Sequence, residues 1–245
     1  MQIVEFDSVD STNLEVRRLW PRLGGGGAVA VRASVQSAGR GRGGHFWRSP
    51  VGGLWFSLGR PLAPGAPPPG GLSLVAGLAL SEAVRECCGL DCLLKWPNDL
   101  IAAGRKLAGI LCEAFPGGNF PLAVIGVGVN GNYPAAELGE DLAMPATTLL
   151  EEMGRECDLG RLFRGSLEQL EKHLGRLERE GFAPFQGLVE ERLVWRKEPV
   201  SFAPAGGDAV QGILAGIDDT GALLLETGEG RRRLVAGDLV RLRRG

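Results

Sequence analysis

A glycine- and arginine-rich segment carries the densest chemical signal in this sequence. Residues 36–47 read QSAGRGRGGHFW, in which Arg40 and Arg42 alternate with glycines. Glycines leave backbone amides open, and guanidinium groups pair with phosphates and carboxylates. The segment lies between two apolar stretches, so we expect an ordered loop that closes over an anion.

Two other functional interpretations of this loop fit less well. Gly39, Gly41 and Gly44 match the G-x-G-x-x-G pattern of dinucleotide-binding proteins. The following residues, FWRSP, cannot open the helix whose N-terminus would hold a pyrophosphate. One arginine-glycine unit is also much shorter than the tracts that bind single-stranded nucleic acid. A tight turn with exposed arginines is the structural alternative.

The run KWPND at residues 95–99 is the second signal. Only four of the 27 basic residues are lysines, and Lys95 directly follows the apolar pair Leu93-Leu94. A lysine at the end of a strand is a compact charge, suited to a phosphate oxygen or a polarised carboxylate. Residues 97–99 would then turn the chain. The alternative is a surface lysine whose stem lies along apolar residues.

Two later stretches, KLAGILCE at 106–113 and IGVGVN at 125–130, predict strands with functional glycines. Gly126 and Gly128 would share one face of a strand, where missing side chains let another group approach closely. Asn130 follows at the strand end, with an amide that can read the edge of a base. These glycines could instead relieve packing against a helix.

These residues need a sheet and helices to position them. Alternating or continuous apolar residues predict strands at 2–6, 28–33, 54–58, 93–96, 107–115 and 122–129. Helices are expected after residues 11–13, from about Ser73, and over 159–181. Thr12 and Glu15 have the spacing of a capping box. A sheet with a few covering helices is the economical arrangement.

The sequence pattern changes after Glu198-Pro199. Short strands at 200–202, 210–217, 222–226, 231–235 and 239–242 are separated by glycine-rich turns. Strands this short and close together predict a small barrel. We therefore expect a first domain over residues 1–197 and a second over residues 198–245.

Composition narrows the class of protein. The chain has 245 residues and a net charge of −2, which gives no global reason for binding DNA, RNA or an anionic membrane. The apolar stretch 72–84 is too short to span a bilayer, and the acidic start resembles no export signal. Five cysteines match no common zinc spacing, so we expect reduced thiols in a cytoplasmic protein.

Taken together and in order, these segments resemble the biotin–protein ligase family. The resemblance rests on Ser11-Thr12-Asn13, Gln36, the loop 39–44, Trp47, and the stretches 95–99, 106–113 and 126–130. It implies an α+β fold: a mixed sheet with covering helices, as in the class II synthetase-like biotin–lipoate ligase catalytic domain, followed by a small SH3-like β-barrel. It also implies an enzyme that converts biotin and ATP to biotinyl-5'-AMP. The biotin is then transferred to a lysine of a biotin carboxyl carrier protein, such as that of acetyl-CoA carboxylase.

The resemblance also implies residue roles. Ser11, Thr12, Asn13 and Gln36 would line the biotin pocket, and Arg40, Gly41 and Arg42 would close over biotin and the phosphate. Lys95 would contact the carboxylate and the α-phosphate and would act in catalysis with Arg40. The nucleotide side would comprise Arg40, Arg42, Trp47, Lys95 and Asn130. Mg²⁺ would shield the leaving pyrophosphate, with ligands that the sequence does not assign.

This chain departs from the family at two loop positions. Gly43 stands where the family often has a further arginine, and His45 stands where it often has a basic residue. We expect a loop that releases the adenylate sooner, and an inactive relative is an alternative. Because the catalytic pattern begins at Asp7, no N-terminal DNA-binding domain and no DNA binding are expected.

Three further points stay open at the level of sequence. A lipoate–protein ligase shares the architecture and the adenylation step, and a non-enzymatic binding module would use the same residues only to hold a ligand. An exposed sheet edge around residues 107–129 could support a homodimer.

Overall fold

The computed structural model describes residues 1–23, 27–61, 69–116, 121–139, 144–204 and 207–242. Its larger sheet comprises β1 (Gln2–Val9), β2 (Val29–Gln36), β3 (Leu54–Pro61), β4 (Leu93–Lys95), β5 (Asp99–Ala102), β6 (Arg105–Phe115) and β7 (Leu122–Val129). The spatial order is β1-β2-β3-β7-β6-β5-β4. Strands β1 and β2 pair in parallel, and the other neighbours pair antiparallel.

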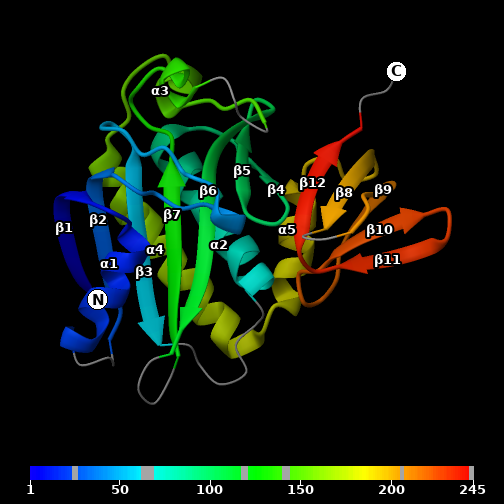
Figure 1. Ribbon diagram of the computed structural model, residues 1–245, viewed down its shortest axis with the longest axis horizontal. Coiled ribbons are helices and arrows are strands. Elements are labelled where there is room, and N and C mark those ends of the chain that lie inside the picture. The colour runs from blue at the N-terminus through cyan, green and yellow to red at the C-terminus, as the bar shows by residue number, and fades with distance from the viewer. Residues whose placement is uncertain (24–26, 62–68, 117–120, 140–143, 205–206, 243–245) are drawn as a thin grey trace.

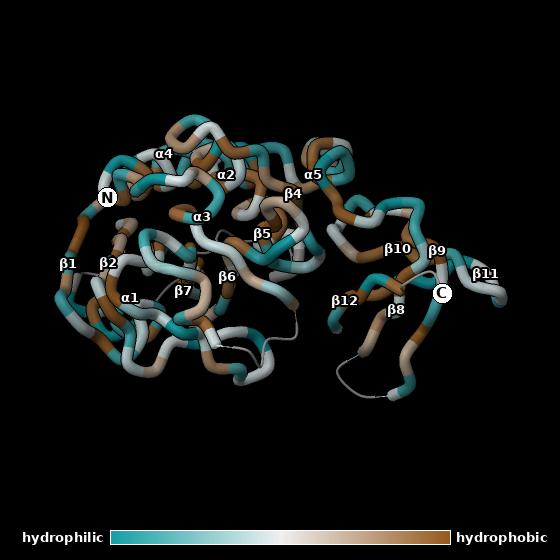
Figure 2. Tube along the Cα trace, turned by 90° about the horizontal axis from the view of Figure 1, so that it is seen from above, coloured by the Kyte–Doolittle hydropathy of each residue, from teal (hydrophilic) through white to brown (hydrophobic). Residues whose placement is uncertain are grey.

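The smaller sheet lies at the C-terminal end of the chain, beside the larger one (Figures 1 and 2). It comprises β8 (Pro199–Pro204), β9 (Val210–Ile217), β10 (Leu223–Thr227), β11 (Gly230–Leu234) and β12 (Gly237–Arg241). The order is β11-β10-β9-β8-β12, with antiparallel pairs throughout. The predicted fold class, a mixed sheet with covering helices followed by a small β domain, is therefore confirmed.

Helices cover the two faces of the larger sheet unequally. On one face lie the long helices α2 (Pro69–Cys88) and α4 (Leu159–Glu180), whereas α1 (Thr12–Leu19) lies on the other (Figure 1). The shorter α3 (Leu149–Met153) and α5 (Gln186–Arg192) occupy connections. Helix α4 buries residues at intervals of three and four, among them Leu167, Leu170 and Leu174, as an amphipathic covering helix should.

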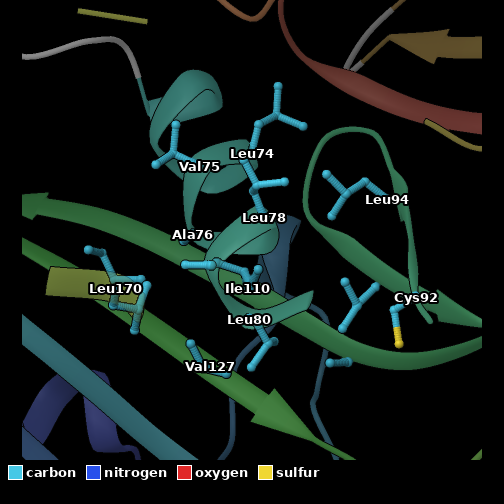
Figure 3. Packing of buried hydrophobic residues seen from close by; sticks show 14 of the residues in the cluster. Leu74, Val75, Ala76, Leu78, Leu80, Cys92, Leu94, Ile110, Val127 and Leu170 are labelled. Carbon is cyan, nitrogen blue, oxygen red and sulfur yellow. The ribbon is translucent and has the colours of Figure 1, made fainter. Parts of the chain in front are cut away.

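The main core lies between the larger sheet and α2. Leu74 and Leu78 of α2 are almost fully buried, and they pack with Ile110 of β6 and Val127 of β7 (Figure 3). A separate, smaller cluster lies under α1 on the opposite face and includes Val16 and Trp20. Because side chains alternate along a strand, each strand contributes to both faces. Phe56 and Leu58 of β3 face the main core, and Ser57 between them faces the other side.

Three local expectations were wrong, wholly or in part. The turn expected at residues 97–99 is present at Pro97 and Asn98, but Asp99 already begins β5, which pairs with both β4 and β6. Ser11 and not Thr12 is the N-cap residue of α1, and its side chain makes no capping hydrogen bond. Strands β6 and β7 lie inside the sheet, so the described edges of this sheet are β1 and β4, and not the strands at 107–129 as expected.

No helix among the described residues is long and apolar enough to cross a membrane.

Candidate active site

Buried polar side chains meet where α1 begins. Gln36 Oε1 accepts hydrogen bonds from Thr12 N at 2.9 Å and from Thr12 Oγ1 at 3.1 Å. Ser57 Oγ lies 2.7 Å from Thr12 Oγ1 and 2.6 Å from Asn13 Oδ1. The structure thus brings together Thr12, Asn13 and Gln36, and it adds Ser57, which sequence analysis missed. The only signal for Ser57 was a polar residue inside an otherwise apolar strand.

A glycine makes room for this polar cluster. Gly126 of β7 pairs with Ser57 of β3 and with Leu111 of β6. A Cβ atom on Gly126 would collide with the side chain of Asn13. Asn13 Nδ2 donates to Glu113 Oε2 at 2.7 Å and to the Leu111 carbonyl at 3.3 Å. Gly126 gives room to Asn13, which belongs to helix α1, so the alternative that this glycine relieves packing against a helix holds here.

The arginine-glycine loop is ordered by its own hydrogen bonds. Gly41 N donates to the His45 carbonyl at 2.7 Å, and Trp47 N donates to the Gly39 carbonyl at 2.9 Å. Arg40 is exposed to solvent. Gly43 has φ of +63°, a left-handed conformation that costs other residues energy. Gly43 therefore differs from the family's arginine in two ways: it lacks the positive charge, and its left-handed backbone conformation favours glycine.

The second loop arginine contacts the C-terminal sheet. One nitrogen of Arg42 lies 3.4 Å from Asn98 Oδ1 and 3.3 Å from Asp238 Oδ1. The other donates to the Gly237 carbonyl at 3.1 Å. Nearby, Trp96 Nε1 donates to the Gly221 carbonyl at 3.0 Å. Both the loop and the run 95–99 are therefore anchored to the small sheet, which the sequence did not predict.

Trp47 covers the strands on the same face as the polar cluster. Cβ atoms on Gly109 or Gly128 would collide with its indole ring, so both glycines are needed for this packing. Lys106 Nζ lies 5.1 Å from the ring centroid, within the range of a cation–π interaction. The indole Nε1 is buried without a hydrogen-bond partner among the described residues.

Two lysines share one buried carboxylate. Asp99 Oδ1 lies 2.7 Å from Lys106 Nζ, and Asp99 Oδ2 lies 3.7 Å from Lys95 Nζ. The Lys95 side chain is only 13% exposed, and burial lowers its pKa, although Asp99 opposes this shift. Two cations against one anion leave an excess of positive charge. This excess suits a bound anion.

Asn130 is held by the chain itself. Its Nδ2 donates to the Thr147 carbonyl at 2.9 Å and to the Lys106 carbonyl at 3.3 Å. Its Oδ1 accepts a hydrogen bond from the Tyr133 hydroxyl at 2.9 Å. Both amide hydrogens are thus engaged, and the side chain fixes the loop after β7. This geometry favours a positioning role over direct reading of a base.

A series of contacts connects most of the predicted residues. Gln36 Nε2 donates to Ser49 Oγ at 2.8 Å, and Ser49 Oγ donates to the Trp47 carbonyl at 3.1 Å. The Trp47 ring then contacts Lys106, which leads through Asp99 to Lys95. Ser11 is buried at the start of α1, next to Thr12. No local sequence pattern indicated a role for Ser57, Glu113, Asp99, Lys106 or Asp238.

Comparisons with known proteins agree with this arrangement. The family model "Biotin/lipoate A/B protein ligase family" matches residues 5–130, and "Biotin protein ligase C terminal domain" matches residues 198–241. A biotin–[acetyl-CoA-carboxylase] ligase of Paracoccus denitrificans is 36% identical, covering 94% of this chain and 96% of that protein. One of Mycobacterium tuberculosis is 35% identical over 88% of this chain and 79% of its own.

A solved structure supports the same relationship. The biotin protein ligase of Aquifex aeolicus in complex with biotin and ATP superposes with a TM-score of 0.84 at 30% identity, covering 99% of each chain. The matched regions include the glycine-rich loop, the run 95–99 and the C-terminal sheet. On the strength of both sequence and fold, this chain belongs to the biotin protein ligase family.

Proposed function

We propose that this protein is a biotin–[acetyl-CoA-carboxylase] ligase that works through biotinyl-5'-AMP. The observation that carries the proposal is the chain of contacts that leads from Thr12 and Gln36 to Lys95. It offers neutral hydrogen-bonding groups at one end and buried cations at the other. Biotin has the matching polarity, with a neutral ureido ring at one end and a carboxylate at the other. The similar proteins of Paracoccus denitrificans and Mycobacterium tuberculosis are named for the same activity.

The polar cluster at α1 is proposed to bind the ureido ring. A buried ureido group needs partners for its carbonyl oxygen and its N–H groups. Ser11, Thr12 and Ser57 supply hydroxyls, and Asn13 and Gln36 supply amide groups, all on one side of the sheet. Glu113 keeps the Asn13 amide oriented. The buried position of these groups favours a ligand that fills the space and excludes water.

Lys95 and Arg40 are proposed to act on the reacting groups. A carboxylate oxygen of biotin attacks the α-phosphorus of ATP, and the bond to the β-phosphate breaks, releasing pyrophosphate. Negative charge grows on the non-bridging oxygens, where the buried Lys95 ammonium is most effective. Arg40 is exposed at the base of the turn 42–44, where it pairs with Phe46, and can approach a bound phosphate. Gly41 and Arg42 belong to the same loop, which would close over biotin and the phosphate.

The second step transfers the acyl group. The amine of the carrier lysine attacks the carbonyl carbon of the adenylate, the C–O bond to the phosphate breaks, and AMP leaves. The attacking nucleophile comes from the carrier, so the chain needs only to hold the adenylate and shield it from water. Arg40 and Arg42 suit that holding role, because guanidinium groups pair with phosphate.

The nucleotide is proposed to lie toward Trp47. Its indole ring, together with Lys106, forms the part of the surface beyond Lys95. Asn130 would support this region by fixing the loop between β7 and α3. Mg²⁺ is proposed to enter with ATP on its phosphate oxygens. Among the described residues no three acidic, histidine or cysteine side chains gather as a metal site, so the chain's own ligands do not fit a dedicated magnesium cage.

The division of labour between the two sheets is also a proposal. Residues 1–197 would bind biotin and ATP, and residues 198–245 would hold the loop through Asp238 and Gly237. The carrier would be a biotin carboxyl carrier protein. A homodimer stays a prediction. Because residues 107–129 lie inside the larger sheet, a dimer that joins sheet edges would have to use β1 or β4.

The test is a turnover assay with two acids. Purified protein is incubated with ATP, Mg²⁺ and a biotin carboxyl carrier domain, with biotin or lipoate in parallel. We expect pyrophosphate release and a mass increase of the carrier with biotin only. Transfer of lipoate would change the substrate, and absence of pyrophosphate with either acid would favour a binding module or an inactive relative.

A further inference from the structure

Two cysteines from distant parts of the sequence meet on the α2 and α4 side of the molecule. Cys88 is the last residue of α2, and Cys157 precedes Asp158, the N-cap residue of α4. Their sulfur atoms lie 3.2 Å apart. A disulfide bond needs a separation of about 2.05 Å, so a movement of about 1 Å would convert this contact into a bond. None of the residues in the proposed ligand surface is involved.

The surroundings favour reaction at Cys157. The hydrogen bond between the two sulfurs lowers the pKa of the Cys157 thiol, and the nearby cations Arg155 and Arg161 act in the same direction, whereas burial and Asp158 oppose them. A thiolate is the reactive form of cysteine. Cys88 is only partly buried, which gives small oxidants a route to the pair. Cys87 beside it points elsewhere, with its sulfur 3.9 Å from the Arg161 carbonyl.

We propose that Cys88 and Cys157 form a redox-active dithiol site, which a peroxide converts to an intramolecular disulfide. The Cys157 thiolate attacks a peroxide oxygen, the O–O bond breaks and water leaves after protonation, giving a sulfenic acid. The Cys88 sulfur then attacks the Cys157 sulfur, the S–O bond breaks, and a second water leaves. Two thiols are oxidised by two electrons, and one hydrogen peroxide is reduced to two waters.

The site is connected to the loop after β7. Asn132 Nδ2 donates to the Cys157 carbonyl at 2.9 Å, and Cys157 N donates to Asn132 Oδ1 at 2.9 Å. Asn132 lies two residues after Asn130, whose side chain fixes the same loop. A shift of Cys157 toward Cys88 therefore pulls on the loop that borders the proposed nucleotide region. This consequence for ATP rests on the proposed function, whereas the disulfide itself does not.

The disulfide is tested by peptide mapping of the intact protein. The protein is treated with hydrogen peroxide, free thiols are blocked, and trypsin releases peptides 86–95 and 156–161. We expect these two peptides to appear joined, two hydrogen atoms lighter than their sum, and to separate after reduction. Absence of the joined species when peroxide has oxidised other thiols would overturn the proposal.

Variants identify the partner, because peptide 86–95 contains three cysteines. The joined species should persist in Cys87→Ser, the matched control from the same helix end, and should be lost in Cys88→Ser and in Cys157→Ser. Persistence in Cys88→Ser would assign the bond to Cys87 or Cys92 and overturn the proposed pair. If a serine variant does not fold, fragmentation of the joined peptides from Cys87→Ser locates the bond.

The link to the nucleotide is tested by kinetics on the same samples. We expect peroxide to raise the KM for ATP at least about twofold in wild type and in Cys87→Ser, with reversal by a thiol reductant. The KM for biotin should not change. An unchanged KM for ATP in protein that carries the mapped disulfide would disprove the link through Asn132.

Discussion

The two faces of the larger sheet differ in the size of their apolar clusters and in the polar groups they bury. On the face covered by α2 and α4, large apolar side chains such as Phe56, Leu78 and Val127 form the main core, and His173 of α4 bonds to Glu82 of α2. On the other face the same strands present Ser57, Gly126 and other small or polar residues, over which Asn13 and Trp47 lie.

This contrast shows how one strand can serve stability and chemistry at once. Phe56, Ser57 and Leu58 are adjacent in β3, yet alternate residues belong to different faces. Substitutions on the apolar face should therefore change the free energy of unfolding. Substitutions on the polar face should change kinetic constants with less effect on stability.

The largest effect is expected at Lys95. Lys95→Ala removes the buried cation beside the reacting phosphate and should lower kcat/KM for adenylation by about 10²–10³-fold. Pyrophosphate release measures this, and the melting temperature should change little. Lys172→Ala, at a side chain 67% exposed on α4, is the control. Unfolding of Lys95→Ala would contradict the prediction that substitutions on the polar face affect kinetics more than stability.

Leu78→Ala tests the apolar face. Leu78 is fully buried between α2 and the sheet, so the cavity should lower the free energy of unfolding by about 2–5 kcal/mol. Denaturant titration measures the change, and the KM values for biotin and ATP should stay the same in the folded protein. Leu93→Ala, at a leucine 46% exposed, should cost far less. Equal losses in the two variants would contradict the assignment of the core.

Gln36→Ala tests the polar cluster. The variant removes the acceptor for Thr12 N and Thr12 Oγ1, at a cost of about 1–2 kcal/mol in ligand binding. The KM for biotin should rise about tenfold, while the KM for ATP changes little. Steady-state kinetics with each substrate varied in turn makes the measurement, and Gln169→Ala, at an exposed hydrogen bond between α4 and α2, serves for comparison. A rise confined to ATP would place the biotin end elsewhere.

The pH dependence of adenylation follows from the burial of Lys95. Because its pKa is lowered, Lys95 loses its proton, and with it the positive charge, at a lower pH than an exposed lysine. The rate should therefore fall with rising pH below the ordinary lysine pKa of about 10.4. In Lys95→Arg, which keeps its charge, any remaining activity should lack this alkaline decline. The same decline in both proteins would assign it to another group.

The smallest effect is expected at Gly43. Gly43→Arg supplies the charge common in the family and should slow dissociation of the adenylate a few-fold. The left-handed backbone at this position opposes the change, at a cost of about 1–2 kcal/mol. Gly43→Ala carries the same strain without the charge. A dissociation rate in wild type no faster than in Gly43→Arg would refute the idea of a looser loop.

The sequence alone determined much of the fold. Alternation and helical spacing located most strands and the helices α2 and α4, because these signals arise from contacts that repeat along one element. The pattern failed at Thr12, where a capping box was expected. There the hydroxyl bonds to Gln36, so a contact between elements replaced the local one.

In the candidate site, too, local sequence signals identified some residues, and contacts between distant elements decided the rest. Residue types and spacing singled out Arg40 and Lys95, because a charged residue in an unusual local setting is visible in sequence, whereas Trp47 was assigned a role only through the family resemblance. Only the tertiary structure decided which groups these residues meet. Asn13 and Glu113 lie 100 positions apart, and Arg42 and Asp238 lie 196 apart. No local pattern encodes such pairs, because they form only when β6 and β12 are brought beside segments from the start of the chain.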